Sequence, residues 1–324
     1  MPKAIRFHQT GGPEMLRWEE VGVGDPGPNE VRVRNRAVGL NFIDIYYRSG
    51  LYPTPLPSGL GLEAAGVVEA VGANISEFKV GDRVAHGSGP LGAYAEVRLM
   101  PADKLVKIPA AIDDRTAAAM MLKGMTAQYL LRRTYKVQPG DAILFHAAAG
   151  GVGLIACQWA NQLGATVIGT VGSDDKADLA RAHGCQHVIV YTRENFVERV
   201  KEITKGEGVA VVYDSVGKDT FDRSLDCLRP LGMMVNFGSA SGPVPPFAPA
   251  TLAAKGSLFL TRPSLMSYTA KRADLVATAN DLFDVVGSGK VKIEIHQTYP
   301  LADAAQAHRD LEGRKTTGAT VLLP

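Results

Sequence analysis

Two periods of hydrophobic positions follow one another along the chain. In the first 123 residues, short runs in which apolar and polar positions alternate are separated by Gly and Pro, as at residues 30–34 and 66–71. A long helical pattern at residues 270–286 and two strand patterns, at 291–297 and 320–323, complete the chain. In between, apolar runs typical of buried strands alternate with helical patterns, which predicts strands at residues 142–145, 166–171, 187–191, 210–214 and 233–237.

These patterns predict an α/β protein with two domains. Strands that alternate with helices predict a doubly wound parallel sheet for residues 124–261. The β-rich stretch, residues 1–123, is expected to be completed by the strands of residues 262–324, so that the parallel-sheet domain is an insertion. A cleft between the two domains would then take a cofactor and a substrate.

A glycine turn after the first predicted strand of the sheet domain carries the first chemical signal. Gly151, Gly153 and Ala156 fit the pattern G-x-G-x-x-A, in which small residues permit a tight turn and the close approach of a pyrophosphate. A phosphate would meet unpaired amides at the positive end of the helix, at Gly150 to Gly153 and including Val152. Such a turn can also simply connect two elements, but the strand and helix alternation after it favours a dinucleotide site.

The end of the next predicted strand indicates which dinucleotide is bound. A site for NAD usually has an Asp or Glu about 20 residues after the glycines, where it binds the ribose 2′-hydroxyl. Here Gly172 and Ser173 take that place, and Ser173, Lys176 and Tyr191 offer hydrogen-bond donors to a 2′-phosphate. The sequence therefore predicts NADPH as the cofactor.

Three residues near this strand end have a second interpretation. Asp174 and the aspartate after it would repel a phosphate if they faced it, although Asp174 is well placed as the N-cap of the next helix. Lys176 can equally be a solvated lysine in a first helical turn, and Tyr191 can equally pack on a neighbouring strand. The prediction of NADPH depends on the donors, rather than the carboxylates, facing the cofactor.

Composition and charge narrow the class of protein. The 324 residues are 46% hydrophobic and 21% charged, as in an ordinary globular enzyme, and the net charge of +2 is too small to indicate a nucleic-acid-binding protein. Cys157, Cys185 and Cys227 are too few for a disulfide framework and match no zinc finger, which favours a reducing compartment. Without a signal-peptide core or an apolar run of about 18 residues, the chain is expected to be cytoplasmic.

Longer sequence blocks carry a family resemblance. The run from Gly140 through the glycine turn to Gln158 resembles the signature of quinone oxidoreductases of the zeta-crystallin type, the zinc-free branch of the medium-chain dehydrogenase/reductase superfamily. The resemblance implies a GroES-like catalytic domain, an inserted Rossmann domain, use of NADPH and commonly a homodimer. Further similar blocks lie along the whole chain, at residues 41–44, 48–53, 61–66, 79–84 and 213–217.

The resemblance also implies a dimer interface and cofactor contacts. The stretch from Gly256 to Leu260 is expected to be an edge strand that pairs with its twofold mate, which would hide an edge prone to aggregation. Lys123 and Thr126 are assigned to the nicotinamide side, and Arg314 to the 2′-phosphate, although Thr126 could merely start a helix and Arg314 could lie in an exposed basic loop. The loops after the fourth and fifth strands should also touch the cofactor, because ligands bind beyond the carboxyl ends of such strands. The predicted cofactor contacts are Lys123, Thr126, Gly150, Gly151, Val152, Gly153, Gly172, Ser173, Lys176, Tyr191, Ser215, Val216, Phe237, Gly238, Ser239 and Arg314.

One departure from the wider superfamily decides the predicted chemistry. Asn41 stands where zinc alcohol dehydrogenases that resemble this chain have a catalytic cysteine, and Leu62 stands where they have a histidine. Their four-cysteine structural loop has no counterpart between Val84 and Met100, and the seven histidines are scattered. Without sulfur or imidazole ligands, no zinc Lewis acid is expected.

A metal-free reductase needs a substrate that already accepts hydride, and a quinone does because the added charge is delocalised. The predicted function is therefore NADPH:quinone oxidoreductase. A pocket of Asn41, Tyr46 and Tyr52 is expected to donate hydrogen bonds to a quinone oxygen in orienting roles. The two tyrosines can equally be ordinary half-buried aromatics, and Asn41 a turn residue.

Two rival functions stay open from the sequence. An enone or alkenal reductase would also transfer hydride from NADPH without a metal. A nucleotide-carrying protein that binds RNA or serves as a crystallin is the rival of another class, and the near-neutral charge argues against RNA. The physiological acceptor, and whether one or two electrons pass per encounter, are left undecided.

Overall fold

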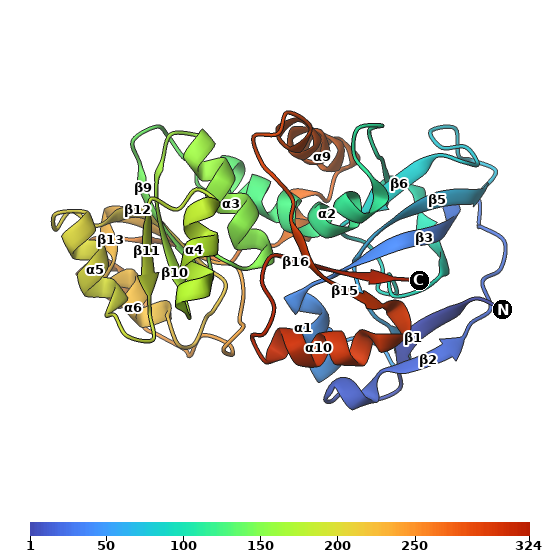
Figure 1. Cartoon of the computed structure of the whole chain (residues 1–324), viewed down its shortest axis with the longest axis horizontal. Helices are drawn as coiled ribbons and strands as arrows, with labels where there is room; N and C mark the ends of the chain where they lie inside the picture. The colour runs from blue at the N-terminus through green and yellow to red at the C-terminus, as the bar shows by residue number, and fades with distance from the viewer. The chain divides into compact units, whose positions relative to one another are not determined.

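The computed structural model describes residues 1–324, which form two compact units (Figure 1). The first unit is Met1–Met125, Tyr268–Gly287 and Ile293–Pro324, and the second is Thr126–Ser267 with Ser288–Lys292. The boundary falls inside helix α2, Asp114–Tyr129. The domain limits of 123/124 and 261/262 stay a prediction.

Two sheets build the first unit. The larger has the strand order β15-β16-β3-β5-β6-β8, with β7 also paired to β3, and only β15 and β16 run parallel. The smaller has the order β2-β1-β4. Because β16 pairs with β3, the last strands complete the N-terminal sheet, as the hydrophobic pattern predicted. The strands are β1 (Lys3–Phe7), β2 (Arg17–Glu20), β3 (Glu30–Leu40), β4 (Ser58–Gly59), β5 (Glu63–Val71), β6 (Arg83–His86), β7 (Val97–Pro101), β8 (Val106–Lys107), β15 (Ile295–Pro300) and β16 (Ala319–Leu323).

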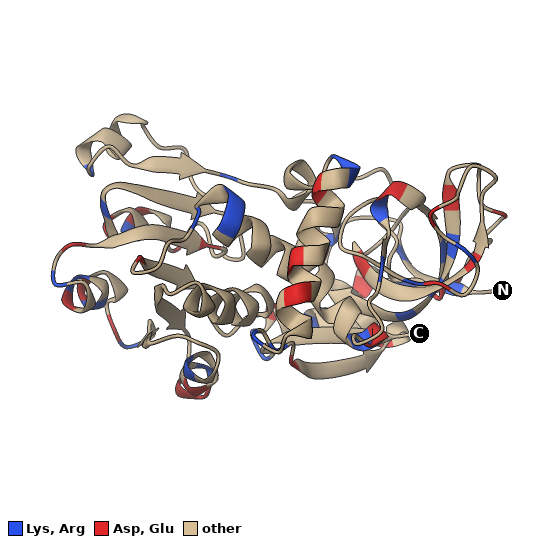
Figure 2. Ribbon diagram, turned by 90° about the horizontal axis from the view of Figure 1, so that it is seen from above, with Lys and Arg blue, Asp and Glu red and all other residues tan.

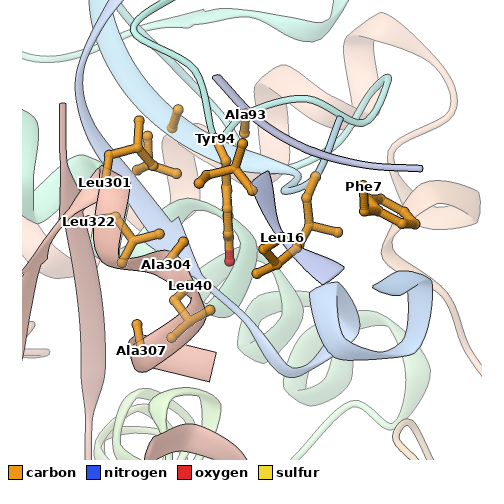
Figure 3. Close-up of a cluster of buried hydrophobic side chains, with 13 residues drawn as sticks. Phe7, Leu16, Leu40, Ala93, Tyr94, Leu301, Ala304, Ala307 and Leu322 are labelled. Carbon is orange, nitrogen blue, oxygen red and sulfur yellow. The ribbon is translucent and has the colours of Figure 1, made fainter. Parts of the chain in front are cut away.

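Helices close the core of the first unit. They are α1 (Phe42–Ser49), the N-terminal part of α2, α9 (Arg272–Gly287) and α10 (Ala304–Glu312). Figure 3 shows a buried cluster in which the Tyr94 ring lies among Leu40, Leu301 and Ala304, so that residues from the two ends of the chain pack together. Removing this apolar surface from water is the main stabilising contribution, at about 25 cal/mol for each Å² buried.

The second unit is built on one parallel sheet with the order β11-β10-β9-β12-β13-β14. The chain starts in the middle at β9, winds out to β11, and crosses back to continue from β12 to β14. This is the doubly wound arrangement, and its order reverses between β9 and β12, where such folds bind ligands. The strands are β9 (Ala142–His146), β10 (Thr166–Val171), β11 (His187–Val190), β12 (Val209–Asp214), β13 (Leu228–Asn236) and β14 (Phe259–Thr261).

Helices connect the strands of this sheet and pack against it (Figure 1). Leu144, Ile168 and Val212, from three neighbouring strands, belong to one buried cluster with side chains of the connecting helices. The cluster contains only apolar residues and Cys227. The helices are α3 (Gly151–Gln162), α4 (Asp174–Ala182), α5 (Phe196–Ile203), α6 (Phe221–Leu225), α7 (Ala250–Ala254) and α8 (Leu265–Tyr268).

At β13, β14 and β15 the predicted starts of the strands differ from the structure. β13 begins at Leu228, five residues before the predicted start, because Leu228 pairs with Val209 across a bulge. β14 begins only at Phe259, because the backbones at Gly256 and Ser257 have positive φ angles of 110° and 56° that interrupt an extended strand. β15 begins at Ile295 rather than 291, since the Gln158 side chain binds both backbone polar groups of Lys292.

Charged residues are distributed over both units without a large region of one sign. In Figure 2, segments with Lys or Arg and segments with Asp or Glu lie interspersed along the chain. This agrees with the net charge of +2. No helix has the length and apolar character needed to cross a membrane.

Candidate active site and nucleotide site

The glycine turn of the second unit begins α3 at the sheet's switch point. Gly150 is the N-cap of α3, and Ala147 before it has a left-handed φ of 55°. A Cβ at Gly153 would lie 2.4 Å from the carbonyl oxygen of Ala147 and 2.6 Å from that of Ala148, so only glycine fits there. The first backbone N–H groups of the helix have no partners within it and carry its positive dipole end. Such a helix start after a glycine turn is a place where anions commonly bind, and the contact with a pyrophosphate stays a prediction.

The ends of β10 and β11 bring predicted 2′-phosphate residues together. A Cβ at Gly172 would lie 2.8 Å from the hydroxyl oxygen of Tyr191, so the tyrosine reaches across the end of β10. Ser173 is exposed beside them, and Lys176 lies in the first turn of α4. Tyr191 itself is 43% exposed, and both its contact with a phosphate and its packing on the neighbouring strand end stay open.

The expectation for Asp174 was wrong. Ser173, not Asp174, is the N-cap of α4, because the chain becomes helical at Asp174. The Asp174 carboxylate instead accepts two hydrogen bonds from Arg193, at 2.7 and 2.6 Å. This pair lowers the pKa of Asp174 and offsets the charge that would have repelled a phosphate.

The loops after β12 and β13 contact each other closely. Asp214, at the end of β12, accepts hydrogen bonds from the backbone N–H groups of Val216 (2.7 Å) and Gly217 (3.1 Å), which fixes the loop containing Ser215 and Val216. A Cβ at Gly238 would lie 2.4 Å from the Ser215 carbonyl oxygen. The predicted contacts of these two loops therefore form one continuous rim of the sheet.

Arg262 holds the loop after β13 from the other side. Its guanidinium donates to the carbonyl oxygens of Asn236 and Gly238, both at 3.0 Å, and to the Ser239 hydroxyl at 3.3 Å. Phe237 in the same loop packs on Phe145 of β9, with ring centroids 5.8 Å apart. The loop is thus fixed by its own unit.

In the first unit, three elements bring Asn41, Glu63 and Lys123 together. Asn41 follows β3, Glu63 begins β5 and Lys123 lies in α2. The Glu63 oxygen Oε2 accepts from Asn41 Nδ2 and from Lys123 Nζ, both at 2.7 Å, while Oε1 accepts from the backbone N–H of Leu122 at 2.8 Å. All three side chains are buried: Glu63 is 0%, Lys123 4% and Asn41 5% exposed.

Gly39 makes room for the Glu63 carboxylate. A Cβ at Gly39 would lie 2.1 Å from Glu63 Oε2 and 2.3 Å from the carbonyl oxygen of Ala118. A buried ion pair loses much hydration, and its attraction offsets that loss only when hydrogen bonding is good. The cluster is therefore a poor way to stabilise the fold, which makes a functional role the better explanation.

This geometry changes the role expected of Asn41. Its amide nitrogen already donates to Glu63 at 2.7 Å and more weakly to the Gly39 carbonyl oxygen at 3.4 Å. Both amide hydrogens are thus directed into the protein. The amide that was expected to donate to a quinone oxygen serves in this structure to bind the carboxylate.

The two predicted tyrosines form an aromatic group on and after α1. The Tyr46 and Tyr52 rings meet edge to face with centroids 5.2 Å apart, and Tyr47 meets Tyr52 in the same way at 5.6 Å. Tyr46 is 7% exposed, whereas Tyr52 is only partly buried. The structure thus brings Tyr46 and Tyr52 together, and their contact with a substrate stays a prediction.

A buried chain of polar groups lies behind α1. Tyr94 Oη donates to Asp44 Oδ2 at 2.8 Å, His308 Nε2 lies 3.2 Å from Tyr94 Oη, and Arg48 Nη1 lies 3.1 Å from His308 Nδ1. Arg48 can only donate, so Nδ1 of His308 accepts and its Nε2 carries the hydrogen. Arg48 is also bound by Glu312 at 2.6 and 3.0 Å.

Burial dominates the ionisation of this chain. It raises the pKa of Asp44 to about 7, against the hydrogen bonds from Tyr94 and the Asn41 backbone N–H that lower it. It lowers the pKa of His308 to about 3, helped by the charge of Arg48. His308 is therefore neutral near pH 7, while Asp44 changes charge in that range.

The predicted cofactor contacts are divided between the two units. Lys123 is in the first unit and Thr126 in the second, three positions apart on α2. Arg314 is in the first unit, in the loop after α10, with a left-handed φ of 57°. Their joint contacts with one cofactor stay a prediction.

Comparison with known proteins gives matches over the full chain. An alcohol dehydrogenase GroES-like domain matches residues 27–110, and a zinc-binding dehydrogenase family matches residues 151–282. The chain is 58% identical to a quinone oxidoreductase of Pseudomonas aeruginosa, with 100% of both chains covered. This chain belongs to the quinone oxidoreductase family.

Solved structures agree with this family. The structure of the Escherichia coli quinone oxidoreductase complexed with NADPH has a TM-score of 0.98 and 53% identity, covering 99% of this chain and 100% of that one. A 2-haloacrylate reductase of a Burkholderia species is 51% identical over 100% of this chain and 99% of its own. The GroES-like and Rossmann-like domains predicted from the sequence are thus confirmed.

Sequence reasoning missed several polar residues of this quinone oxidoreductase family member. Glu63 was noted only within a block of family resemblance, and Asp44, Arg193 and His308 received no role. A charged residue directly at the start of an apolar strand, as in Glu63-Ala64-Ala65, is a signal that could have identified Glu63, since such residues are seldom buried without a partner. Arg193 had no such signal, because its pairing depends on where β11 ends.

Proposed function

We propose that this chain is an NADPH-dependent quinone reductase, in which hydride from NADPH and one proton convert a quinone to a hydroquinone. The observation that carries the proposal is the full-length match to quinone oxidoreductases at 58% identity. The glycine turn at the switch point of the second unit supports it, because Gly153 permits the tight turn from strand to helix that dinucleotide-binding folds use. When bound, NADPH supplies the hydride.

The 2′-phosphate would be held by Ser173, Lys176 and Tyr191, with Arg314. The absence of a carboxylate at Gly172 and the pairing of Asp174 with Arg193 support this assignment. A relative of known structure is complexed with NADPH, which agrees with the choice. The remaining proposed contacts are Lys123, Thr126, Gly150, Gly151, Val152, Gly153, Ser215, Val216, Phe237, Gly238 and Ser239.

We further propose that the reaction needs no metal ion. Leu62 is an aliphatic side chain that cannot ligate a metal, and the Asn41 amide is bound to Glu63. The substrate wall would be formed by Asn41, Tyr46 and Tyr52. The tyrosine hydroxyls would orient the quinone, and Asn41 would hold its part of the wall in place.

We also propose a homodimer and a cytoplasmic location. β14 is the edge strand of the six-stranded sheet, and its Phe259 and Leu260 are 57% and 37% exposed, which leaves an apolar edge that a second copy would cover. The cytoplasmic location is supported by three unpaired cysteines. Light scattering of the wild type and of Leu260→Lys tests the dimer, because the lysine should leave monomers.

Steady-state oxidation of NADPH and NADH tests the proposed function. The acceptors are a panel of quinones of graded size, a panel of enones and alkenals, and 2-haloacrylate, because a close relative carries that name. We expect turnover with quinones and a preference for NADPH. Faster turnover with the unsaturated carbonyl compounds would assign the chain to double-bond reduction, and oxidation without any acceptor preference would contradict both.

A further inference from the structure

Lys123 is among the proposed cofactor contacts, and its surroundings point to a further task beside the substrate. We propose that Lys123, held by Glu63, supplies the positive charge that stabilises the quinone oxygen while it gains negative charge. The inference rests on the proposed quinone reduction. It names Lys123 as the residue that takes the place of a Lewis acid, and Glu63 as the residue that positions it.

Geometry places the ammonium beside Asn41, a residue of the proposed substrate wall. Lys123 Nζ and Asn41 Nδ2 both lie 2.7 Å from the same oxygen, Glu63 Oε2, so the ammonium is a direct neighbour of Asn41. A lysine ammonium has three hydrogens, and Glu63 is the one acceptor that the structure provides for them. Two donors remain for a bound molecule.

The Glu63 carboxylate allows the buried Lys123 to stay positively charged. An ammonium buried without a counter-ion is driven towards its neutral form. Glu63 supplies the counter-ion, and its carboxylate is itself shared with the Leu122 N–H and the Asn41 amide. Two further ionisable groups interact with this cluster: Asp44, on which both Lys123 and Glu63 exert a charge effect, and Tyr94, on which Glu63 exerts one.

The reaction requires such a charge and no proton from Lys123. The C–H bond of the dihydronicotinamide breaks, its electron pair forms the new bond to the quinone, and the oxidised cofactor and a hydroquinone anion result. The anion then takes a proton from solvent. A fixed cation stabilises the developing oxyanion strongly in a site of low dielectric, where removal of one such group typically costs about 100-fold to 1,000-fold in kcat.

The experiment replaces the ion pair by neutral residues of similar size. Lys123→Met alone would leave Glu63 buried and unpaired, so the test uses the double variant Glu63→Gln with Lys123→Met. Lys271→Met, which removes an exposed lysine of the same unit, is the control. Thermal unfolding shows that each variant folds, fluorescence titration gives NADPH affinity, and single-turnover kinetics give the rate with quinones of equal size and graded reduction potential.

We expect the double variant to keep NADPH affinity within about 3-fold and to lose at least about 10-fold in hydride-transfer rate. The loss should be largest for electron-rich quinones, which depend most on the external charge, so the rate should vary more steeply with reduction potential. An equal loss for every quinone with a matching fall in NADPH affinity would make Lys123 a cofactor contact only. An unchanged rate with lower thermal stability would make the pair structural, and an inactive wild type would overturn the proposed function itself.

Discussion

The two units build their sites in different ways. The nucleotide turn of the second unit is contiguous in the chain, from Ala147 to Gly153, and rests on an apolar core. The polar cluster of the first unit joins the buried residues Asn41, Glu63 and Lys123, and Glu63 is 22 residues from Asn41 and 60 from Lys123. A site made of backbone groups can be local, whereas a site of buried charges needs counter-ions from several elements.

The two sites also differ in what they cost the free energy of folding. Backbone amides at a helix end stay partly solvated until a phosphate binds them, so the second unit loses little by holding them ready. The first unit keeps Asp44, Arg48, Glu63 and Lys123 all at 4% exposure or less. Removing one partner of such a pair leaves an uncompensated charge, so substitutions should affect stability in the first unit and affinity in the second.

The largest effect is expected from Glu63→Ala. It leaves Lys123 buried without its counter-ion and should lower the free energy of unfolding by about 3–5 kcal/mol in urea denaturation. Asp226→Ala, which breaks the exposed pair with Lys255 in the second unit, is the control and should change it by less than about 1 kcal/mol. Similar losses for the two variants would remove the energetic distinction between the units.

Gly153→Ala should lower the affinity for NADPH. The added Cβ would lie 2.4 Å from the Ala147 carbonyl oxygen, so the turn must shift away from the shape that fits a pyrophosphate. We expect NADPH affinity to fall about 100-fold, equivalent to about 2.7 kcal/mol, in fluorescence titration. Gly287→Ala, where a Cβ meets nothing within 4 Å, should bind normally. Undiminished binding to Gly153→Ala would place the pyrophosphate elsewhere.

Asp44 should give the first unit an unusual dependence of stability on pH. Its pKa is about 7 in the folded chain and 3.8 ordinarily, so the folded state holds the proton more tightly and loses stability as pH rises through that window. His86 and His308, whose pKa values are lowered to about 3, act in the opposite direction and lose stability as pH falls below about 6.5.

Urea denaturation of Asp44→Asn between about pH 4 and pH 8 tests this prediction. Relative to the wild type, the variant should gain stability as pH rises through the window, because it has no proton to lose there. Asp82→Asn is the control of opposite sign, because Lys107 lowers the pKa of Asp82 and its stabilisation is lost as pH falls. Parallel curves for the wild type and Asp44→Asn would show that this carboxyl titrates normally.

The smallest effect is expected at the 2′-phosphate. Lys176→Ala should weaken NADPH by about 10-fold, about 1.4 kcal/mol, and leave NADH nearly unchanged, because only the phosphate carries the charge that Lys176 meets. Titration with both cofactors measures the ratio. Equal losses for NADPH and NADH would show that the phosphate is not held there.

The sequence predicted the local features of the molecule better than the pairings between distant segments. Local patterns located β10 and the start of α3 correctly, because strand period and glycine spacing depend on neighbouring residues. They failed at Asp174, where one residue decides between N-cap and first helical turn, and at Glu63, whose partners lie directly after β3 and on α2. Pairings between distant segments leave no period in the chain, so only the folded structure shows them.

That the reaction needs no metal ion is tested most directly by quinone-dependent NADPH oxidation in protein of measured metal content. The protein is dialysed against a strong chelator, its zinc is determined by mass spectrometry, and turnover is compared before and after. We predict unchanged turnover with zinc far below one ion per chain. Loss of activity on chelation that returns with stoichiometric zinc would contradict the proposal.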